Sequence, residues 1–115
     1  MSKSGLKAEK DIKAAVYLLD GGFLEGAAFH AQQAAEKALK YAYIRKTGKL
    51  KKVHDLVFLA KEVGLDGALA EKCSKIDPFY AESRYPGFGG DFSREDVENA
   101  VQTANEVIKW ARTKA

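Results

Sequence analysis

Four side chains with polar groups fall on one edge of a helix expected over residues 23–47. At 100° per residue, with His30 at 0°, Gln33 falls at about −60°, Lys37 at about −20° and Tyr41 at about +20°. An imidazole, an amide, an ammonium and a phenol on one edge could hold a phosphate or a base. The same spacing also suits a half-buried border, where Tyr41 packs, Lys37 snorkels and His30 bonds a neighbouring helix.

A second candidate site lies at Arg84 and Tyr85, where a helix gives way to the Gly-rich stretch RYPGFGGDF. An arginine there can present a planar fork to a phosphate, and a tyrosine can stack on a base. Alternatively, Arg84 pairs with Glu82 or another surface acid, and Tyr85 fills the core beneath the loop. The spacing alone does not separate these two interpretations.

His54 and Asp55 precede a third expected helix, and Asp55 is the residue expected to cap it. With two histidines, one cysteine and no HExxH spacing, the sequence predicts no metal site. It predicts no cofactor either, because GFGG at residues 87–90 matches no phosphate-binding fingerprint. No local signature of a hydrolytic triad is present.

The elements that position these residues are predicted to be helices. The first 75 residues contain no proline, and glycines follow the apolar periodic segments. We expect helices over 6–20, 23–47, 54–63 and 67–83, the last kinked or split by Pro78, and a final helix that Ser93 caps. The expected core stripe of the first helix contains Ala8, Ile12, Ala15, Val16 and Leu19.

These helices predict an all-α, up-and-down bundle of four to five helices, a single domain over residues 1–115. The second helix carries a stripe of small side chains, which favours close core packing against the first and last helices; the stripe contains Ala27, Ala31, Ala34, Ala35, Ala38 and Ala42. No segment of 18 apolar residues is present, so we expect no membrane span. The single Cys73 and the lack of an apolar leader indicate a reducing cytoplasm.

Charge places a limit on nucleic-acid binding. Nineteen basic and 16 acidic residues give a net charge of +3, which is not typical of a dedicated DNA reader. Any phosphate affinity must therefore come from local clusters. The basic segment RKTGKLKK over residues 45–52 is one such cluster, although charge runs of this kind are commonly solvated surface.

Three blocks of sequence, in this order, resemble a HEPN domain (higher eukaryotes and prokaryotes nucleotide-binding). They are FHAQQAAEKALK at residues 29–40, HDL at 54–56 and SRYP at 83–86. The resemblance runs from about Lys7 to Trp110. It implies a compact helical bundle that pairs as a homodimer. It also implies a minimal nucleotidyltransferase as partner, in a toxin–antitoxin or two-component nucleotidyltransferase system.

Many HEPN domains are metal-independent ribonucleases, marked by an arginine followed after four to six residues by a histidine. In this chain, the positions where that histidine would follow Arg84 hold Gly89, Gly90 and Asp91. Acid–base cleavage of RNA needs a group that exchanges protons near neutral pH, usually histidine. The departure therefore leaves a binding role for Arg84 and puts nuclease activity in question.

Three hypotheses follow. In the first, the protein binds a nucleotide or RNA through His30, Gln33, Lys37, Arg84 and Tyr85, and acts with a nucleotidyltransferase. In the second, it is a metal-independent endoribonuclease that uses Arg84 with His30 or His54 for proton transfer. In the third, it is a non-catalytic dimeric interaction module.

Overall fold

All regular secondary structure in the described part of the chain is helical. The computed structural model describes residues 3–49, 52, 55–79 and 92–114, with side chains from residue 7 to residue 113. These residues form five helices: α1 (Lys3–Asp20), α2 (Leu24–Thr47), α3 (Leu56–Val63), α4 (Gly67–Ile76) and α6 (Arg94–Lys114). The predicted all-α bundle is confirmed.

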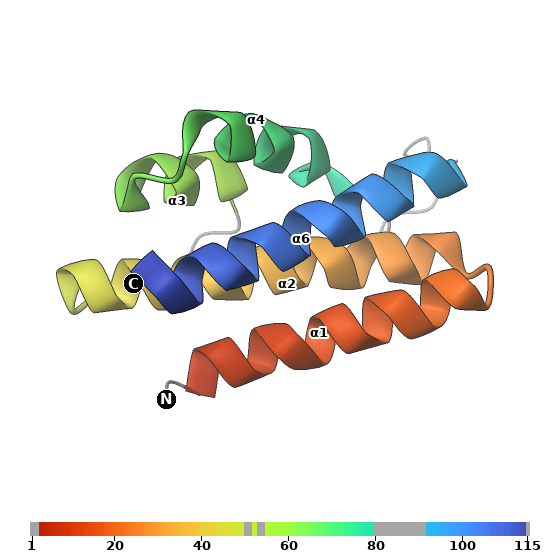
Figure 1. Cartoon of the computed structure of the whole chain (residues 1–115), viewed down its shortest axis with the longest axis horizontal. Coiled ribbons are helices and arrows are strands. Elements are labelled where there is room, and N and C mark those ends of the chain that lie inside the picture. Colours follow the sequence, from red (N-terminus) through yellow and green to blue (C-terminus); the bar gives the residue numbers. More distant parts are fainter. Residues whose placement is uncertain (1–2, 50–51, 53–54, 80–91, 115) are drawn as a thin grey trace.

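Three long helices and one pair of short helices make the bundle (Figure 1). The turn at Gly21 and Gly22 reverses the chain between α1 and α2, and α6 packs against both of these helices. The Arg94 guanidinium donates to the Leu19 carbonyl at 3.2 Å, which joins the start of α6 to the end of α1. The α3–α4 pair covers α2 and α6 on the remaining side. Helix α2 is therefore the central element.

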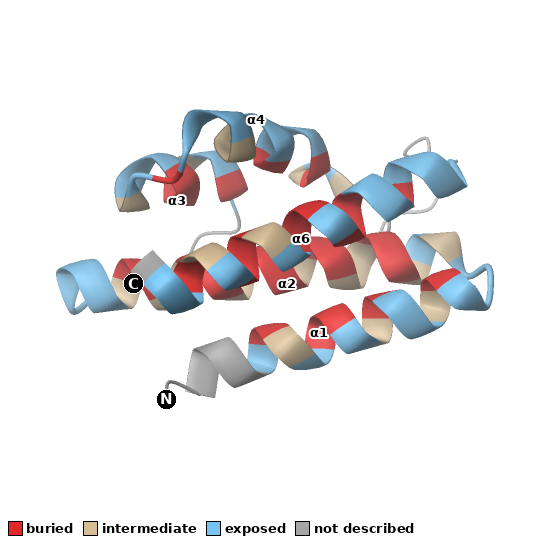
Figure 2. Cartoon of the chain, viewed as in Figure 1, coloured by how far each residue is buried: buried red, intermediate tan, exposed pale blue. Residues whose placement is uncertain are grey.

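The core lies where α1, α2 and α6 meet (Figure 2). All six alanines of the predicted stripe on α2 are at most 3% exposed, and the facing apolar residues of α6 are also buried. Small side chains allow the neighbouring backbones to approach closely, which produces a tightly packed centre. The prediction that this stripe is core packing is confirmed.

The helix ends follow the predicted capping chemistry. The Asp55 carboxylate accepts a hydrogen bond from the Phe58 amide at 3.0 Å, and the Ser93 hydroxyl accepts one from the Asp96 amide at 3.0 Å. Helix α4 ends at Ile76, ahead of Pro78, so the helix expected over 67–83 does not continue through the proline. Proline has no amide hydrogen to donate to the preceding turn, which explains why the helix stops here.

One core prediction was wrong. Val16 was expected in the buried stripe of the first helix, but 41% of it is exposed. At 100° per residue, Val16 stands about 80° from Ala8, whereas Ile12, Ala15 and Leu19 stand within about 40°. Only the narrower face of α1 is covered by α2 and α6.

Among the described residues, no helix is long and apolar enough to cross a membrane.

Candidate functional site

A carboxylate from α1 organises the polar edge of α2, which we define as His30, Gln33, Lys37 and Tyr41. Asp11 Oδ1 lies 2.8 Å from His30 Nδ1, and Asp11 Oδ2 accepts from Lys37 Nζ at 2.5 Å. The Asp11 side chain is 11% exposed, while the His30 and Lys37 side chains are 33% and 36% exposed. The carboxylate is therefore largely buried between two half-exposed partners.

This geometry fixes the orientation of the imidazole. An ionised carboxylate only accepts hydrogen bonds, so Nδ1 of His30 carries a hydrogen and donates it in the hydrogen bond to Asp11. In the neutral ring, Nε2 is then the acceptor. The Phe29 ring meets the His30 ring edge to face, with centroids 5.3 Å apart, and restricts it further. The pairing of His30 with α1 matches the alternative in which this edge is a half-buried border and His30 bonds a neighbouring helix.

The other two members of the polar edge have different surroundings. The Gln33 amide donates to Gln32 Oε1 at 2.7 Å, within a buried chain of polar groups on α2 that continues to Glu36 and Lys40. Tyr41 packs partly against the core, and the Arg45 guanidinium lies 5.9 Å from its ring centre. The predicted edge therefore divides into an Asp11-bound pair, a glutamine tied to the interior and a half-buried tyrosine.

Asp11 is the residue that the sequence analysis missed. Its position gave a signal, because it lies three residues after the buried Ala8 and four before the buried Ala15. A carboxylate near the buried face of a helix needs a partner. The periodicity of α1 shows that the Asp11 carboxylate needs a hydrogen-bond partner. Which residues of α2 supply that partner depends on how the two helices pack.

A second group of acids lies where α3 and α4 meet α2. Asp77 Oδ1 accepts from the Leu56 amide at 3.0 Å, so two carboxylates serve the start of α3. Burial raises the pKa of Asp77, and the nearby Asp55 and Glu36 carboxylates add to this effect. Burial likewise raises the pKa of Cys73 to about 12, with a smaller contribution from Asp77. Asp77 thus accepts a backbone hydrogen bond at the junction of the short helices, in surroundings that disfavour its ionised form.

A groove of about 420 Å³ separates α4 from α6. Lys72 on one wall pairs with Glu106 on the other at 3.3 Å, and Ile76 and Phe79 also line the groove. Because its basic and acidic side chains balance, the groove offers no net charge to a ligand. No group of three or more His, Cys, Asp or Glu residues within the described ranges could hold a metal.

Three predicted site residues lie outside the described residues: His54, Arg84 and Tyr85. Most of the Gly-rich segment that begins at Arg84 lies outside them as well. The meeting of Arg84 with the polar edge of α2 therefore stays a prediction. The residues that the structure brings together are His30 and Lys37, through Asp11.

Comparisons with known proteins agree with this architecture. The model of the HEPN domain family matches residues 1–114. The crystal structure of TT1696 from Thermus thermophilus is similar, with a TM-score of 0.88 and 25% identity, over 97% of this chain and 95% of that one. The structure of ST0689, an archaeal HEPN homologue, matches with a TM-score of 0.77 and 25% identity, over 99% and 98% of the two chains. No curated protein matches.

Proposed function

The chain belongs to the HEPN family, and on that premise we propose that it is a nucleotide- or RNA-binding protein that acts with a minimal nucleotidyltransferase. The family assignment supports a nucleotide-binding or RNA-related module. The proposal adds the partner, the homodimer and the place in a toxin–antitoxin or two-component nucleotidyltransferase system. The ligand would bind at His30, Gln33, Lys37, Arg84 and Tyr85.

The observation that carries this proposal is the pairing of His30 and Lys37 on Asp11. The carboxylate orders two hydrogen-bonding side chains, one imidazole and one ammonium, on a half-exposed edge of α2. Lys37 has three N–H donors and gives one to Asp11, so others can reach a ligand. Preordered groups lose less conformational entropy on binding, which favours recognition at this edge.

Charge at the polar edge makes Arg84 the decisive residue of the proposal. The Asp11 carboxylate cancels the charge of Lys37, so a phosphate needs a further cation.

We therefore expect Arg84→Ala to abolish most of the heat of binding in calorimetric titrations with ATP and with a short RNA. Arg112→Ala is the matched control, because it removes an arginine that pairs with Glu9 on the surface. Equal heats for wild type and Arg84→Ala would remove Arg84 from the site.

A second candidate function is favoured by the same hydrogen bond. An aspartate that accepts from Nδ1 of a histidine holds Nε2 as a proton acceptor, the arrangement used by many general bases. His30 could thus supply proton transfer in a metal-independent endoribonuclease that lacks a histidine after Arg84, and His54 is the other candidate.

Incubation of the protein with labelled RNA in EDTA tests this second function. We expect His30→Ala to lose cleavage, and Asp11→Asn to retain a reduced rate because the amide still has an oxygen that accepts from Nδ1. No cleavage by the wild type, or cleavage unchanged in both His30→Ala and His54→Ala, would contradict it. Light scattering tests the homodimer. A mass of two chains would support it, and a mass of one chain would contradict it.

A further inference from the structure

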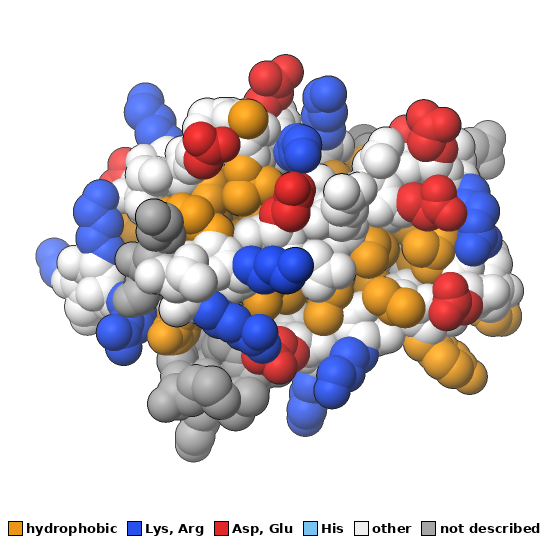
Figure 3. Space-filling model, in the orientation of Figure 1, with side chains coloured by type: hydrophobic (Ala, Val, Ile, Leu, Met, Phe, Trp, Pro, Cys, Tyr) orange, Lys and Arg blue, Asp and Glu red, His pale blue; other side chains and the backbone are white. Residues whose placement is uncertain are grey.

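Large apolar side chains are exposed at the turn between α1 and α2. Of the four large hydrophobic residues that are exposed in the described part of the chain, three lie within residues 16–23: Val16 at 41%, Tyr17 at 79% and Phe23 at 64%. Figure 3 shows hydrophobic side chains that project from the molecule near this turn. Single exposed apolar residues are ordinary on a protein surface, whereas neighbouring ones mark an interaction site. We define the turn face as Tyr17, Leu18, Phe23, Leu24 and Glu25.

The backbone of the turn holds the Phe23 ring in place. Gly22 adopts a left-handed conformation (φ 81°), and its amide donates to the Leu19 carbonyl at 3.0 Å. The Phe23 amide donates to the Leu18 carbonyl at 2.8 Å. This pair of bonds ends many helices, and it brings the side chains at the positions of Leu18 and Phe23 together. A Cβ at Gly21 would lie 3.0 Å from the Phe23 ring, so the ring lies across the bare glycine.

A hollow of about 470 Å³ lies beside this ring. It is lined by Leu18, Phe23, Leu24, Glu25 and Gly26. A Cβ at Gly26 would lie 3.0 Å from Leu18 Cδ1, so the Leu18 side chain packs directly on the backbone of α2. Tyr17 stands one helical turn before Gly21, on the same side of α1, and therefore next to the Phe23 ring. Two exposed rings thus border a hollow with an apolar floor.

The residues at this turn are not those that stabilise helix ends best. Phe23 is the N-cap of α2 and its side chain makes no capping hydrogen bond, whereas Ser, Thr, Asp and Asn are preferred there. Asp20 ends α1, where the negative end of the helix dipole disfavours a carboxylate. Departures from the locally stable sequence are expected at functional surfaces. Binding therefore explains the ring and the carboxylate better than helix stability does.

Carboxylates dominate the end of the molecule that carries the turn face. Arg94 joins the start of α6 to the end of α1 through the Leu19 carbonyl, and it pairs with Glu98 at 3.2 Å. Arg94 is the one basic residue within 17–20, 24–27 and 94–98, and these ranges contain the acidic residues Asp20, Glu25, Glu95, Asp96 and Glu98. The nearest lysine of α1, Lys13, precedes them by one turn. This end is therefore negative, although the whole chain carries a net charge of +3.

We infer that the turn face docks a short segment of a partner protein, which carries one or two apolar side chains between lysines or arginines. An apolar side chain would fill the hollow, and the flanking cations would face the carboxylates. Docking at this face needs no nucleotide at the polar edge of α2, so it extends beyond the proposed function.

Two observations favour a segment over a second copy of the chain. A twofold dimer pairs a surface with itself, so a copy would bring the same carboxylates face to face. The exposed area is also small. A whole aromatic side chain covers about 150–250 Å², so exposed fractions of 79% and 64% amount to roughly 300 Å² for Tyr17 and Phe23. One side of a stable protein interface covers about 800 Å².

The test is an NMR titration of the isotope-labelled protein with a peptide of sequence GKKLFKKG. We expect the shifted amides to gather at residues 17–26, and we expect the matched peptide GEELFEEG to bind more weakly. The net charge of +3 favours the acidic peptide, so this order isolates the effect of the local carboxylates. Tyr17→Ser with Phe23→Ser should weaken binding of GKKLFKKG about tenfold, because buried aromatic anchors carry most of the energy of such contacts. Val57→Ser, which removes the remaining exposed large hydrophobic residue, is the control.

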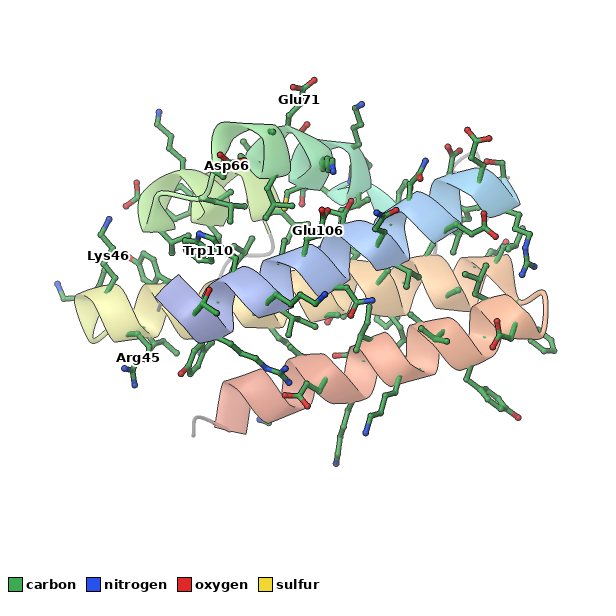
Figure 4. All side chains as sticks on the ribbon, in the orientation of Figure 1. Arg45, Lys46, Asp66, Glu71, Glu106 and Trp110 are labelled. Carbon is green, nitrogen blue, oxygen red and sulfur yellow. The ribbon has the colours of Figure 1, made fainter. Side chains whose placement is uncertain are left out.

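A second pair of variants tests the charges alone. Asp20→Asn with Glu25→Gln should weaken binding of GKKLFKKG about threefold, and less so at high salt, because exposed ion pairs are individually weak and screened. Asp66→Asn with Glu71→Gln is the matched control, since Figure 4 shows both acids on the α3–α4 side of the bundle, away from α1. The control is expected to bind like the wild type. The amide spectra also report whether each variant is folded.

Several outcomes would overturn docking of a basic segment. These are no amide shift with GKKLFKKG, equal affinity for the two peptides, and unchanged affinity in Tyr17→Ser with Phe23→Ser. Light scattering tests the other occupant. A mass of two chains that falls to one chain in Tyr17→Ser with Phe23→Ser would assign the turn face to a second copy instead.

Discussion

Replacement of Asp11 by alanine is expected to destabilise the fold and release both groups on the polar edge of α2. The variant removes the hydrogen bonds to His30 Nδ1 at 2.8 Å and to Lys37 Nζ at 2.5 Å. The two partners keep access to water, because about a third of each side chain is exposed. They therefore recover part of their solvation, whereas the packing of α1 against α2 loses its polar connection.

The magnitude follows from these two contacts. A hydrogen bond to a charged group contributes about 1.5–3 kcal/mol, so two such bonds contribute at most about 6 kcal/mol. Partial exposure of the partners and relief of the desolvation of Asp11 both reduce this value. We expect a loss of about 2 kcal/mol, and a fall in Tm of roughly 8 °C for a domain of this size.

Urea denaturation of wild type and Asp11→Ala measures the loss directly. Asp20→Ala is the control on the same helix, because Asp20 is exposed at the end of α1, and it is expected to change stability by less than about 0.5 kcal/mol. A double-mutant cycle with Lys37→Met should give a coupling of about 1 kcal/mol. Asp11→Ala as stable as Asp20→Ala would refute the view that this carboxylate joins α1 to α2.

Three further predictions concern buried groups and turns. Because burial raises the pKa of Cys73 to about 12, the native protein at pH 8 is expected to react with a thiol reagent only as fast as it unfolds; rapid labelling without denaturant would contradict this. The raised pKa of Asp77 means that the folded protein holds this proton more tightly than the unfolded chain. The free energy of unfolding should therefore fall as pH rises from about 3.8 through the raised value, and urea titrations should show a smaller fall in Asp77→Asn. Gly48→Ala is expected to cost about 1 kcal/mol because φ is 73°, whereas Gly67→Ala, with open space around a new Cβ and a helical position, should be neutral or stabilising; equal thermal shifts would contradict this.

The sequence predicted the fold in considerable detail because most of its signals are local. The alanine stripe, the cap at Asp55 and the cap at Ser93 each depend on residues within a few positions, and the structure contains all three. The prediction was weaker where neighbouring elements decide. Val16 is exposed because only a narrow face of α1 is covered. Periodicity alone left open whether Pro78 kinks or splits the helix expected over residues 67–83, and α4 ends at Ile76.

The candidate site was predicted less completely, for a physical reason. Helical spacing placed His30 and Lys37 on one edge of α2, and both reach the same carboxylate. That carboxylate belongs to Asp11, 19 residues before His30 in the chain, and is brought to the edge by tertiary packing alone. Helical spacing relates residues within one element, so it identified one side of this contact and not the other.

The presence of Asp11 changes what the polar edge can recognise. With His30 neutral, the charges of Asp11 and Lys37 cancel, so this edge offers directed hydrogen bonds and little net charge. In the proposed site, Arg84 would supply the affinity for a phosphate, and the polar edge would contribute discrimination between ligands. Nucleic-acid interfaces commonly divide in this way, with phosphate contacts that position the strand and other contacts that specify it. Substitution of His30 should therefore alter the preference among RNA sequences, whereas Arg84→Ala should weaken binding to all of them alike; an unchanged preference in His30→Ala would contradict this.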